Sequence, residues 1–245
     1  MARHKNYDPA DVVGVNWATV LVGTKGPATP FPDISNFKFE DATTYPTGFV
    51  PLGLTSRESL PSVTTDGGEE TVLDTAEMKN VESLTSGKSF SIAFTVHSLN
   101  KNTLKIAFGG GKDESQVVKG SGTSTQIIQG ISSGDNSLEL PVLIIYSGGG
   151  KNVGLYWPRV KVSGGTLADV SMESLMALNF TGKMLQPTTE HLKEITKVFT
   201  SGGSSGGSHE GYLIKPSAPA VTAKAVVALE GGDPASPVPA VVPGG

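Results

Sequence analysis

The stretch GKSFSIAFTVHSLNKNTLKIAFGGG, Gly87–Gly111, decides the fold of this chain. Its first half alternates apolar residues with small or polar ones, and this period of two predicts a half-buried strand. Ser98 and Asn100 can accept hydrogen bonds from the free N–H groups at a helix start. The following pattern predicts one α-helix near residues 99–108. One face of this helix carries Leu104, Ala107 and Phe108. We expect a β-sheet with this helix laid over its apolar face.

The composition favours a mainly β fold with a minor helical part. The chain has 245 residues, of which 37% are hydrophobic and 17% charged, with 31 Gly and 16 Pro. This mixture suits short strands joined by turns better than helical bundles. The net charge of −4 gives no overall basic field for gripping nucleic acid. Since cysteine is absent from the sequence, disulfides and thiolate chemistry are excluded.

The sequence predicts a soluble protein that is used without export through a membrane. The start, MARHKNYDPAD, lacks the apolar core of a secretory signal. The longest apolar run, Pro141–Tyr146, is too short to span a bilayer. We therefore expect no membrane partner.

The chain divides into three parts by composition. Residues 1–50 predict an extended N-terminal arm with one strand, residues 51–200 a β-domain, and residues 201–245 a Gly/Ser linker with a Pro/Ala-rich tail. An arm of this kind can wrap a neighbour as easily as its own domain. The candidate contacts of the arm with another subunit are Trp17, Phe31 and Phe37. For Trp17, a place in the core of its own domain is the more ordinary interpretation.

A projecting acidic hairpin is predicted over residues 60–79. The turn signal Asp66-Gly67-Gly68 stands between Val63 and Val72. We interpret the segments that hold these two valines as the two strands of the hairpin. A hairpin that projects from a body is a good contact between subunits, although a solvated loop explains any one of its charges. The candidate contact residues are Asp66, Gly67, Gly68, Glu69 and Glu70.

The rest of the sheet is predicted from short apolar runs. Strands are expected at residues 78–84, 116–118, 126–128, 137–146, 151–162, 170–181 and 211–214, with a short helix as the alternative for 170–181. In the fifth of these, Pro158 predicts an edge or a bulge. Residues 190–199 are ambiguous. A strand is favoured over a helix there, because Thr196, Val198 and Thr200 prefer sheets.

A search for chemistry finds no catalytic, cofactor or metal site in the sequence. His4, His97, His191 and His209 stand far apart and outside any metal-binding frame. The run Gly87-Lys88-Ser89 lacks the first glycine and the following helix of a P-loop. The letters GxSxG at Gly130–Gly134 lead into a predicted strand, whereas a nucleophile elbow leads into a helix.

Three segments resemble the major tail (tail tube) protein of long-tailed bacteriophages, especially those of actinobacterial hosts. They are VGTKGPATPFPD at Val22–Asp33, FVPLGLTSRES at Phe49–Ser59, and the strand and helix at Ser86–Gly109. Their order and spacing agree with that family over roughly residues 10–200. Departures occur at Arg57-Glu58-Ser59 and at Val96-His97-Ser98.

The resemblance implies a β-sandwich or barrel with one flanking helix and no enzymatic activity. Copies would close into rings, hexameric in related tubes, and the rings would stack into the virion tail tube through which DNA is ejected. The hairpin would stack rings, and the arm would reach a neighbour. Glu82 and Glu139 are candidates for an acidic lumen that lets DNA and the tape measure protein pass without specific binding. Other tail proteins would bind the tube ends, and assembly would take place in the host cytoplasm.

Two other functions remain open from the sequence. A capsid decoration or adhesion module of a virion would explain the Gly-, Pro- and Thr-rich strands, but not the order of arm, hairpin, strand and helix. A hydrolase would need a converging set of His, Asp and Ser side chains, for which the sequence gives no pattern.

Overall fold

The computed structural model describes residues 14–56, 59–68, 70–73, 82–85, 87–109, 116–120, 126–131, 137–167, 175–201 and 209–215. Within them the fold is mainly β, as predicted, and every strand pairing is antiparallel. Most of the predicted linker and tail, and the first part of the predicted arm, lie outside the described residues.

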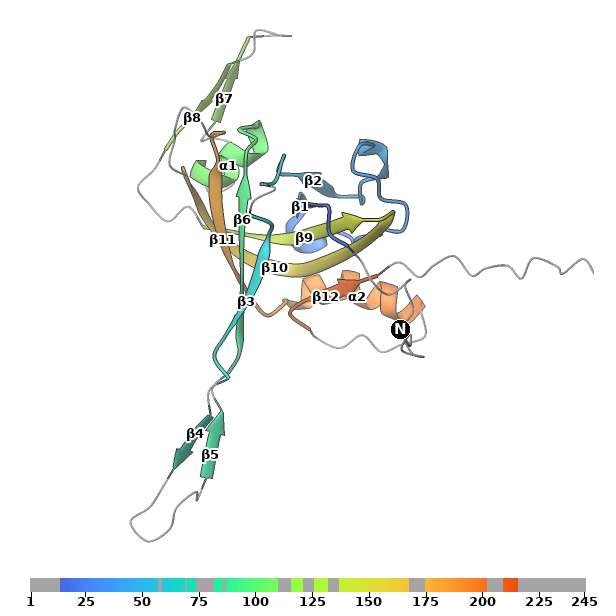
Figure 1. Ribbon diagram of the computed structural model, residues 1–245, viewed down its shortest axis with the longest axis vertical. Helices are drawn as coiled ribbons and strands as arrows, with labels where there is room; N and C mark the ends of the chain where they lie inside the picture. The colour runs from blue at the N-terminus through green and yellow to red at the C-terminus, as the bar shows by residue number, and fades with distance from the viewer. Residues whose placement is uncertain are drawn as a thin grey trace, which may run out of the picture.

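The main sheet has eight strands in the order β2-β1-β9-β10-β11-β6-β3, with β12 paired to β10 (Figure 1). Its members are β1 (Trp17–Gly23), β2 (Phe49–Pro51), β3 (Ser62–Asp66), β6 (Ser89–Val96), β9 (Leu138–Gly148), β10 (Lys151–Leu167), β11 (Leu178–Met184) and β12 (Tyr212–Ile214). Two further pairs stand apart from this sheet: β4 (Glu70–Leu73) with β5 (Glu82–Thr85), and β7 (Gln116–Lys119) with β8 (Gln126–Gln129). The helices are α1 (Lys101–Gly109) and α2 (Thr189–Ser201), with short 3-10 turns at Gly26–Ala28 and Ala42–Thr44.

The sheet is strongly curved but is not closed into a barrel. The segment after β2 meets the end of β6 through two backbone bonds, from Ser56 N to Thr95 O (3.1 Å) and from His97 N to Leu54 O (2.8 Å). These bonds bring the two ends of the strand order together at one corner without a continuous ladder. The expected sandwich or barrel is therefore realised as an open, curved sheet.

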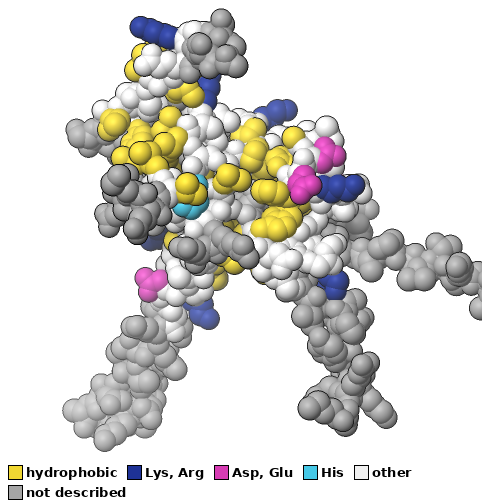
Figure 2. Space-filling model, turned by 45° about the horizontal axis from the view of Figure 1, so that its top comes forward, with side chains coloured by type: hydrophobic (Ala, Val, Ile, Leu, Met, Phe, Trp, Pro, Cys, Tyr) yellow, Lys and Arg dark blue, Asp and Glu magenta, His cyan; other side chains and the backbone are white. Residues whose placement is uncertain are grey.

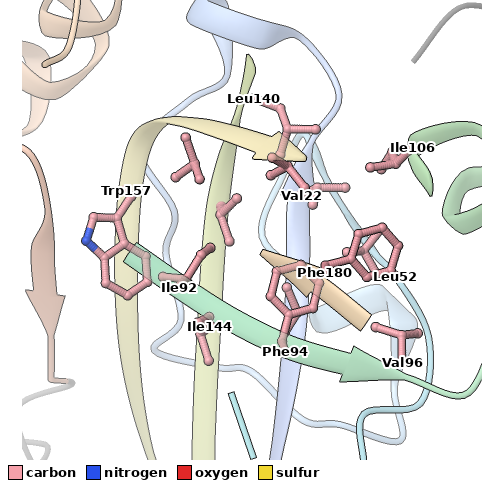
Figure 3. Close-up of a cluster of buried hydrophobic side chains, with 14 of the residues drawn as sticks. Val22, Leu52, Ile92, Phe94, Val96, Ile106, Leu140, Ile144, Trp157 and Phe180 are labelled. Carbon is pink, nitrogen blue, oxygen red and sulfur yellow. The ribbon is translucent and has the colours of Figure 1, made fainter. Parts of the chain in front are cut away.

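The larger core lies on the inner face of this curve, where α1 covers the sheet. Phe94 of β6 and Phe180 of β11 stack with their ring centroids 5.2 Å apart, and both side chains are buried (Figure 3). The helix contributes Ile106 and Ala107, while Leu104 and Phe108 are partly buried against the same core. The helix and its apolar face are thus confirmed. The inward residues of β1 and β9 complete the core with Val20, Val22, Leu140, Val142 and Ile144.

A second core covers the opposite face of β1 and β9. The segment between β1 and β2 folds back on the sheet, where Ile34 and Phe37 are buried beside Leu143 and Ile145. Residues 17–50 therefore belong to the sheet and its cover in the single chain, instead of forming a separate extended arm. The sequence missed this because four prolines in the segment rule out regular structure but not close packing.

Helix α1 begins at the cap that the sequence predicts. Asn100 Oδ1 accepts a bond from Thr103 N (2.9 Å), and Asn100 Nδ2 donates to Leu52 O (2.9 Å). Ser98 instead accepts from Leu54 N through its hydroxyl (2.9 Å). Asn100 therefore both caps the helix and fixes it to the segment that follows β2.

Residues 190–199 form helix α2, so the predicted strand is wrong. Thr188 precedes the helix. Its backbone N–H donates to Nδ1 of His191, with 3.3 Å between the two nitrogens, and its hydroxyl oxygen lies 2.7 Å from the same Nδ1. This arrangement resembles a capping box, with His in place of the usual Glu or Gln. Ile195 faces the body and is buried. The local cap and one apolar stripe outweigh the sheet preference of the threonines.

Most of the other strand predictions agree with the structure. Pro158 lies in a register shift between Trp157 and Val160, which confirms the predicted bulge. The strand predicted over 170–181 starts late, since β11 begins at Leu178, and residues 170–174 lie outside the described residues. Likewise, in the strand predicted over 78–84, β5 starts at Glu82, and residues 78–81 lie outside the described residues.

Candidate assembly surfaces

The outer face of β3, β6, β11 and the end of β10 is a band of small polar side chains. The register places Thr64 beside Ser91, and their hydroxyl oxygens are 2.7 Å apart. Thr95 donates to Asn179 Oδ1 across the next strand pair (2.8 Å). We call this band the polar sheet face. It consists of Ser62, Thr64, Ser91, Ala93, Thr95, Ser163, Asn179, Thr181 and Lys183.

Strand β3 ends the sheet and leaves one edge without a strand neighbour among the described residues. All five of its residues are exposed. An open edge offers backbone N–H and C=O groups to another strand, and soluble proteins usually protect such edges. This edge is therefore a candidate contact between copies of the chain.

A long hairpin extends the β3–β6 pair away from the sheet (Figure 1). Here the structure corrects the prediction, because β3 pairs with β6 and β4 pairs with β5. Asp66-Gly67-Gly68 is consequently not the hairpin turn but a bend in a strand that continues. Gly67 and Gly68 have φ of 85° and 79°. A Cβ on Gly67 would lie 2.4 Å from the carbonyl oxygen of Gly87. The bend thus needs glycine at the base of the projecting part.

The negative charge of the chain is concentrated in this hairpin. Between Asp66 and Thr85 the sequence holds six carboxylates and one lysine, which gives a net charge of −5. Since the whole chain carries −4, the remaining residues sum to +1. The carboxylates are Asp66, Glu69, Glu70, Asp74, Glu77 and Glu82.

A groove lies at the other end of the sheet, between α1 and the ends of β1 and β2. Its volume is about 310 Å³. The floor is apolar and includes Val22, Val50, Ile106 and Leu140. We call it the α1 groove. In the view that brings this end of the molecule forward, hydrophobic side chains gather across the middle and Lys and Arg stand toward the border (Figure 2).

The small β7–β8 sheet exposes apolar side chains. Val117 and Ile128 pair across the strands and are 50% and 42% exposed. An isolated two-stranded hairpin is marginally stable in water, so its apolar face is suited to a further contact.

The three arm residues named from the sequence pack within their own chain. Trp17 lies 4.5 Å from Phe39 and 6.3 Å from Phe37 between ring centroids. Phe31 stands edge-on to Tyr156 at 5.2 Å. For Trp17 the more ordinary interpretation, a contact in its own domain, is the one observed. A contact of this region with a neighbouring subunit stays a prediction.

Of the two lumen candidates, Glu139 can be described in detail. Its carboxylate is exposed and accepts a bond from Arg159 Nε (2.8 Å). That bond lowers the pKa of Glu139 from its ordinary value of 4.5, so it is ionised at neutral pH. Lys161 stands directly opposite Glu139 on β10. Glu82 opens β5 in the hairpin, away from Glu139, so the structure does not bring the two together.

No cluster of metal-ligating side chains is present among the described residues, and none of the described helices is long and apolar enough to cross a membrane.

The described part of the chain thus presents a polar sheet face, an open strand edge and a projecting hairpin, which are surfaces typical of structural subunits. The chain belongs to the phage tail tube protein family, whose model matches residues 8–197. A comparison with curated proteins found no match. The protein is therefore a structural component of a bacteriophage virion, in a family that is typically not enzymatic, and it assembles with other tail components.

Proposed function

We propose that copies of this chain close into rings, hexameric as in the resemblance described above, and that the rings stack into the tail tube through which DNA leaves the virion. The observation that carries this proposal is the open edge of β3 at the end of a curved sheet. Pairing that edge with an edge strand of the next copy removes the open edge, and repeated pairing around an axis closes a ring.

In this arrangement the polar sheet face lines the channel. Its hydroxyl and amide groups already bond to one another, as in Thr64 with Ser91 and Thr95 with Asn179. Nonspecific affinity for DNA comes mainly from contacts of Lys and Arg with the phosphates, and such a face offers few of these cations. At its border Glu139 bonds to Arg159, and Lys161 stands opposite both Glu139 and Lys183, of which Lys183 belongs to the face. The proposed lining is thus mainly hydroxyl and amide groups with isolated lysines, and DNA and the tape measure protein pass it without specific binding.

The hairpin then provides the contact between successive rings, because it extends furthest from the sheet (Figure 1). Asp66 to Glu70, named from the sequence, form the base of that contact and not its tip. Assembly takes place in the host cytoplasm, and other tail proteins bind the two ends of the tube.

Negative-stain electron microscopy of the purified chain over a concentration series tests this proposal. We expect hollow rings at low concentration and tubes of one diameter at high concentration. Particles without a central channel at every concentration, together with a monomeric mass in sedimentation velocity, would contradict self-assembly. They would favour a decoration module that needs its capsid.

A further inference from the structure

We propose that a hollow beside the turn between β9 and β10 binds a neutral saccharide. The hollow has a volume of about 880 Å³, within the range of about 300–1,000 Å³ that is usual for ligand pockets. It is lined by the start of β1, by part of the segment between β1 and β2, and by the turn itself. We call it the turn hollow.

Two aromatic rings form the apolar part of the turn hollow. Trp17 and Phe39 line it, are both partly exposed, and lie 4.5 Å apart between ring centroids. The indole N–H of Trp17 makes no hydrogen bond within the described residues, so it can donate to a ligand. The face of an aromatic ring carries partial negative charge and attracts C–H groups, which cover one side of a sugar ring.

Amide side chains stand beside these rings. Asn16 and Asn36 line the turn hollow and are exposed, and neither side-chain amide makes a hydrogen bond within the described residues. An amide both donates and accepts, as a sugar hydroxyl does, so the two groups match. Asn152 differs, because its amide accepts from the hydroxyl of Ser147 (2.7 Å) and donates to Phe37 O (2.8 Å). These bonds hold the wall of the turn hollow in place before any ligand arrives.

Glycine keeps one side of the turn hollow free of side chains. Gly149 and Gly150, with φ of 60° and 74°, form the two-residue turn of the β9–β10 hairpin. A Cβ on either of them would meet nothing within 4 Å, so this wall is bare backbone beside open space. A Cβ on Gly148 would lie 1.7 Å from Gly14 O, so glycine there lets the start of β1 come close.

The charges of the lining favour a neutral ligand. Lys38, Glu40 and Asp41 are the charged residues that line the turn hollow, and one lysine with two carboxylates sums to −1. Asp41 accepts bonds from the hydroxyl and the N–H of Thr43, which lower its pKa below the ordinary 3.8 and keep it ionised. An anionic ligand therefore finds no surplus of cations. A neutral saccharide instead offers an apolar face to the rings and hydroxyl groups to the amides.

The turn hollow points away from the proposed channel. Strand β10 begins at the turn and pairs with β11 only from Val160 onward, so the turn hollow and the polar sheet face lie at opposite ends of β10 (Figure 1). Phe37 in its lining belongs to the second core, on the side of β1 and β9 opposite the larger core. The position on the outside of a tube rests on the proposed function, whereas binding by the single chain does not.

Titration of the full chain with saccharides tests the proposal. The probes are glucose, galactose, rhamnose, N-acetylglucosamine and chitotriose, and calorimetry measures their affinity. Tryptophan fluorescence reports on the site, because the chain has two tryptophans and Trp157 is buried in the larger core. We expect at least one probe to bind at millimolar concentration and to change the fluorescence. If no probe binds, or if glucose 6-phosphate binds more tightly than every neutral probe, the proposal is wrong.

Two variants locate the bound saccharide. Asn36→Ala removes one exposed amide, and the loss of one hydrogen bond should weaken binding about fivefold. Phe39→Ala removes one ring and should weaken it about tenfold. The matched control, Asn102→Ala, removes an exposed asparagine on α1 outside the turn hollow and should bind as the unchanged protein does. Circular dichroism shows whether each variant keeps its fold. Affinities equal to that of the control in both variants would overturn the proposal.

Assembled tubes distinguish a ligand site from a contact between subunits. Tubes collected by centrifugation should retain the saccharide as the single chain does. Binding that is lost on assembly would mean that a neighbouring subunit covers the turn hollow, and it would overturn the proposal. If no tubes form, the proposed function fails, while the titration of the single chain still decides whether the turn hollow binds a saccharide.

Discussion

Asn100 offers a sharp test of how α1 is held to the sheet. Replacing it by Ala removes the cap on Thr103 N and the donor to Leu52 O. The cap is worth about 1 kcal/mol, and the lost donor about 1 kcal/mol more. Leu52 O keeps a partner, because the hydroxyl of Thr103 also donates to it. We therefore expect Asn100→Ala to lower the free energy of unfolding by about 2 kcal/mol.

Urea unfolding followed by circular dichroism measures this change at a concentration where no rings form. With a slope of about 2 kcal/mol per molar urea, the midpoint should fall by about 1 M. Asn100→Asp keeps the acceptor for Thr103 N but loses the donor, so it should cost about half as much. Asn102→Ala, at an exposed helical position two residues later, should stay within about 0.5 kcal/mol. A midpoint for Asn100→Ala within about 0.2 M of the unchanged protein would refute the reasoning.

Three further changes test other parts of the structure. Phe180→Ala removes one ring of the buried stack with Phe94 and should cost about 3–5 kcal/mol in thermal or urea unfolding; a loss under about 1 kcal/mol would contradict the packing. Gly67→Ala places a Cβ against Gly87 O at positive φ, so it should disturb the base of the hairpin and reduce stacking into tubes, whereas Gly149→Ala, also at positive φ but with open space, should leave stacking unchanged. Burial lowers the pKa of His191 below its ordinary 6.5, so its neutral form stabilises the fold above that pH and the contribution is lost as pH falls through the lowered pKa. His191→Gln keeps an acceptor for the cap without titrating, so the unchanged protein should lose stability relative to this variant as the pH falls below 6.5; parallel pH profiles would contradict the role of the cap.

The sequence predicted those elements whose local pattern and tertiary surroundings agree. The alternation in Ser89–Val96 and the cap at Asn100 produce β6 and α1 because the apolar face of each meets the same core. Residues 190–199 contain sheet-favouring threonines, yet the cap at Thr188 and the burial of Ile195 make them a helix. Propensity alone could not decide between these outcomes.

The candidate surfaces were predicted less completely. The alternation in Ser89–Val96 already contained the signal for the polar sheet face. Its non-apolar positions are all small or hydroxyl residues, and this regularity could have predicted a distinct surface. The α1 groove joins Val22, Val50, Ile106 and Leu140 from four separate segments, so no local pattern indicates it. The Asp-Gly-Gly signal was predicted to be the turn of the hairpin. It is a bend instead, because β3 pairs with β6 and the bend packs against Gly87, twenty residues further on.

The departure of the hairpin from only one end of β6 gives the chain a direction. A contact between unlike ends is heterologous, and heterologous contacts that do not close repeat as an open series. In the proposed tube, hairpins are therefore exposed at one terminus and the α1 ends of the sheets at the other, so the tube is polar. The two termini of the proposed tube therefore require partners of different chemistry.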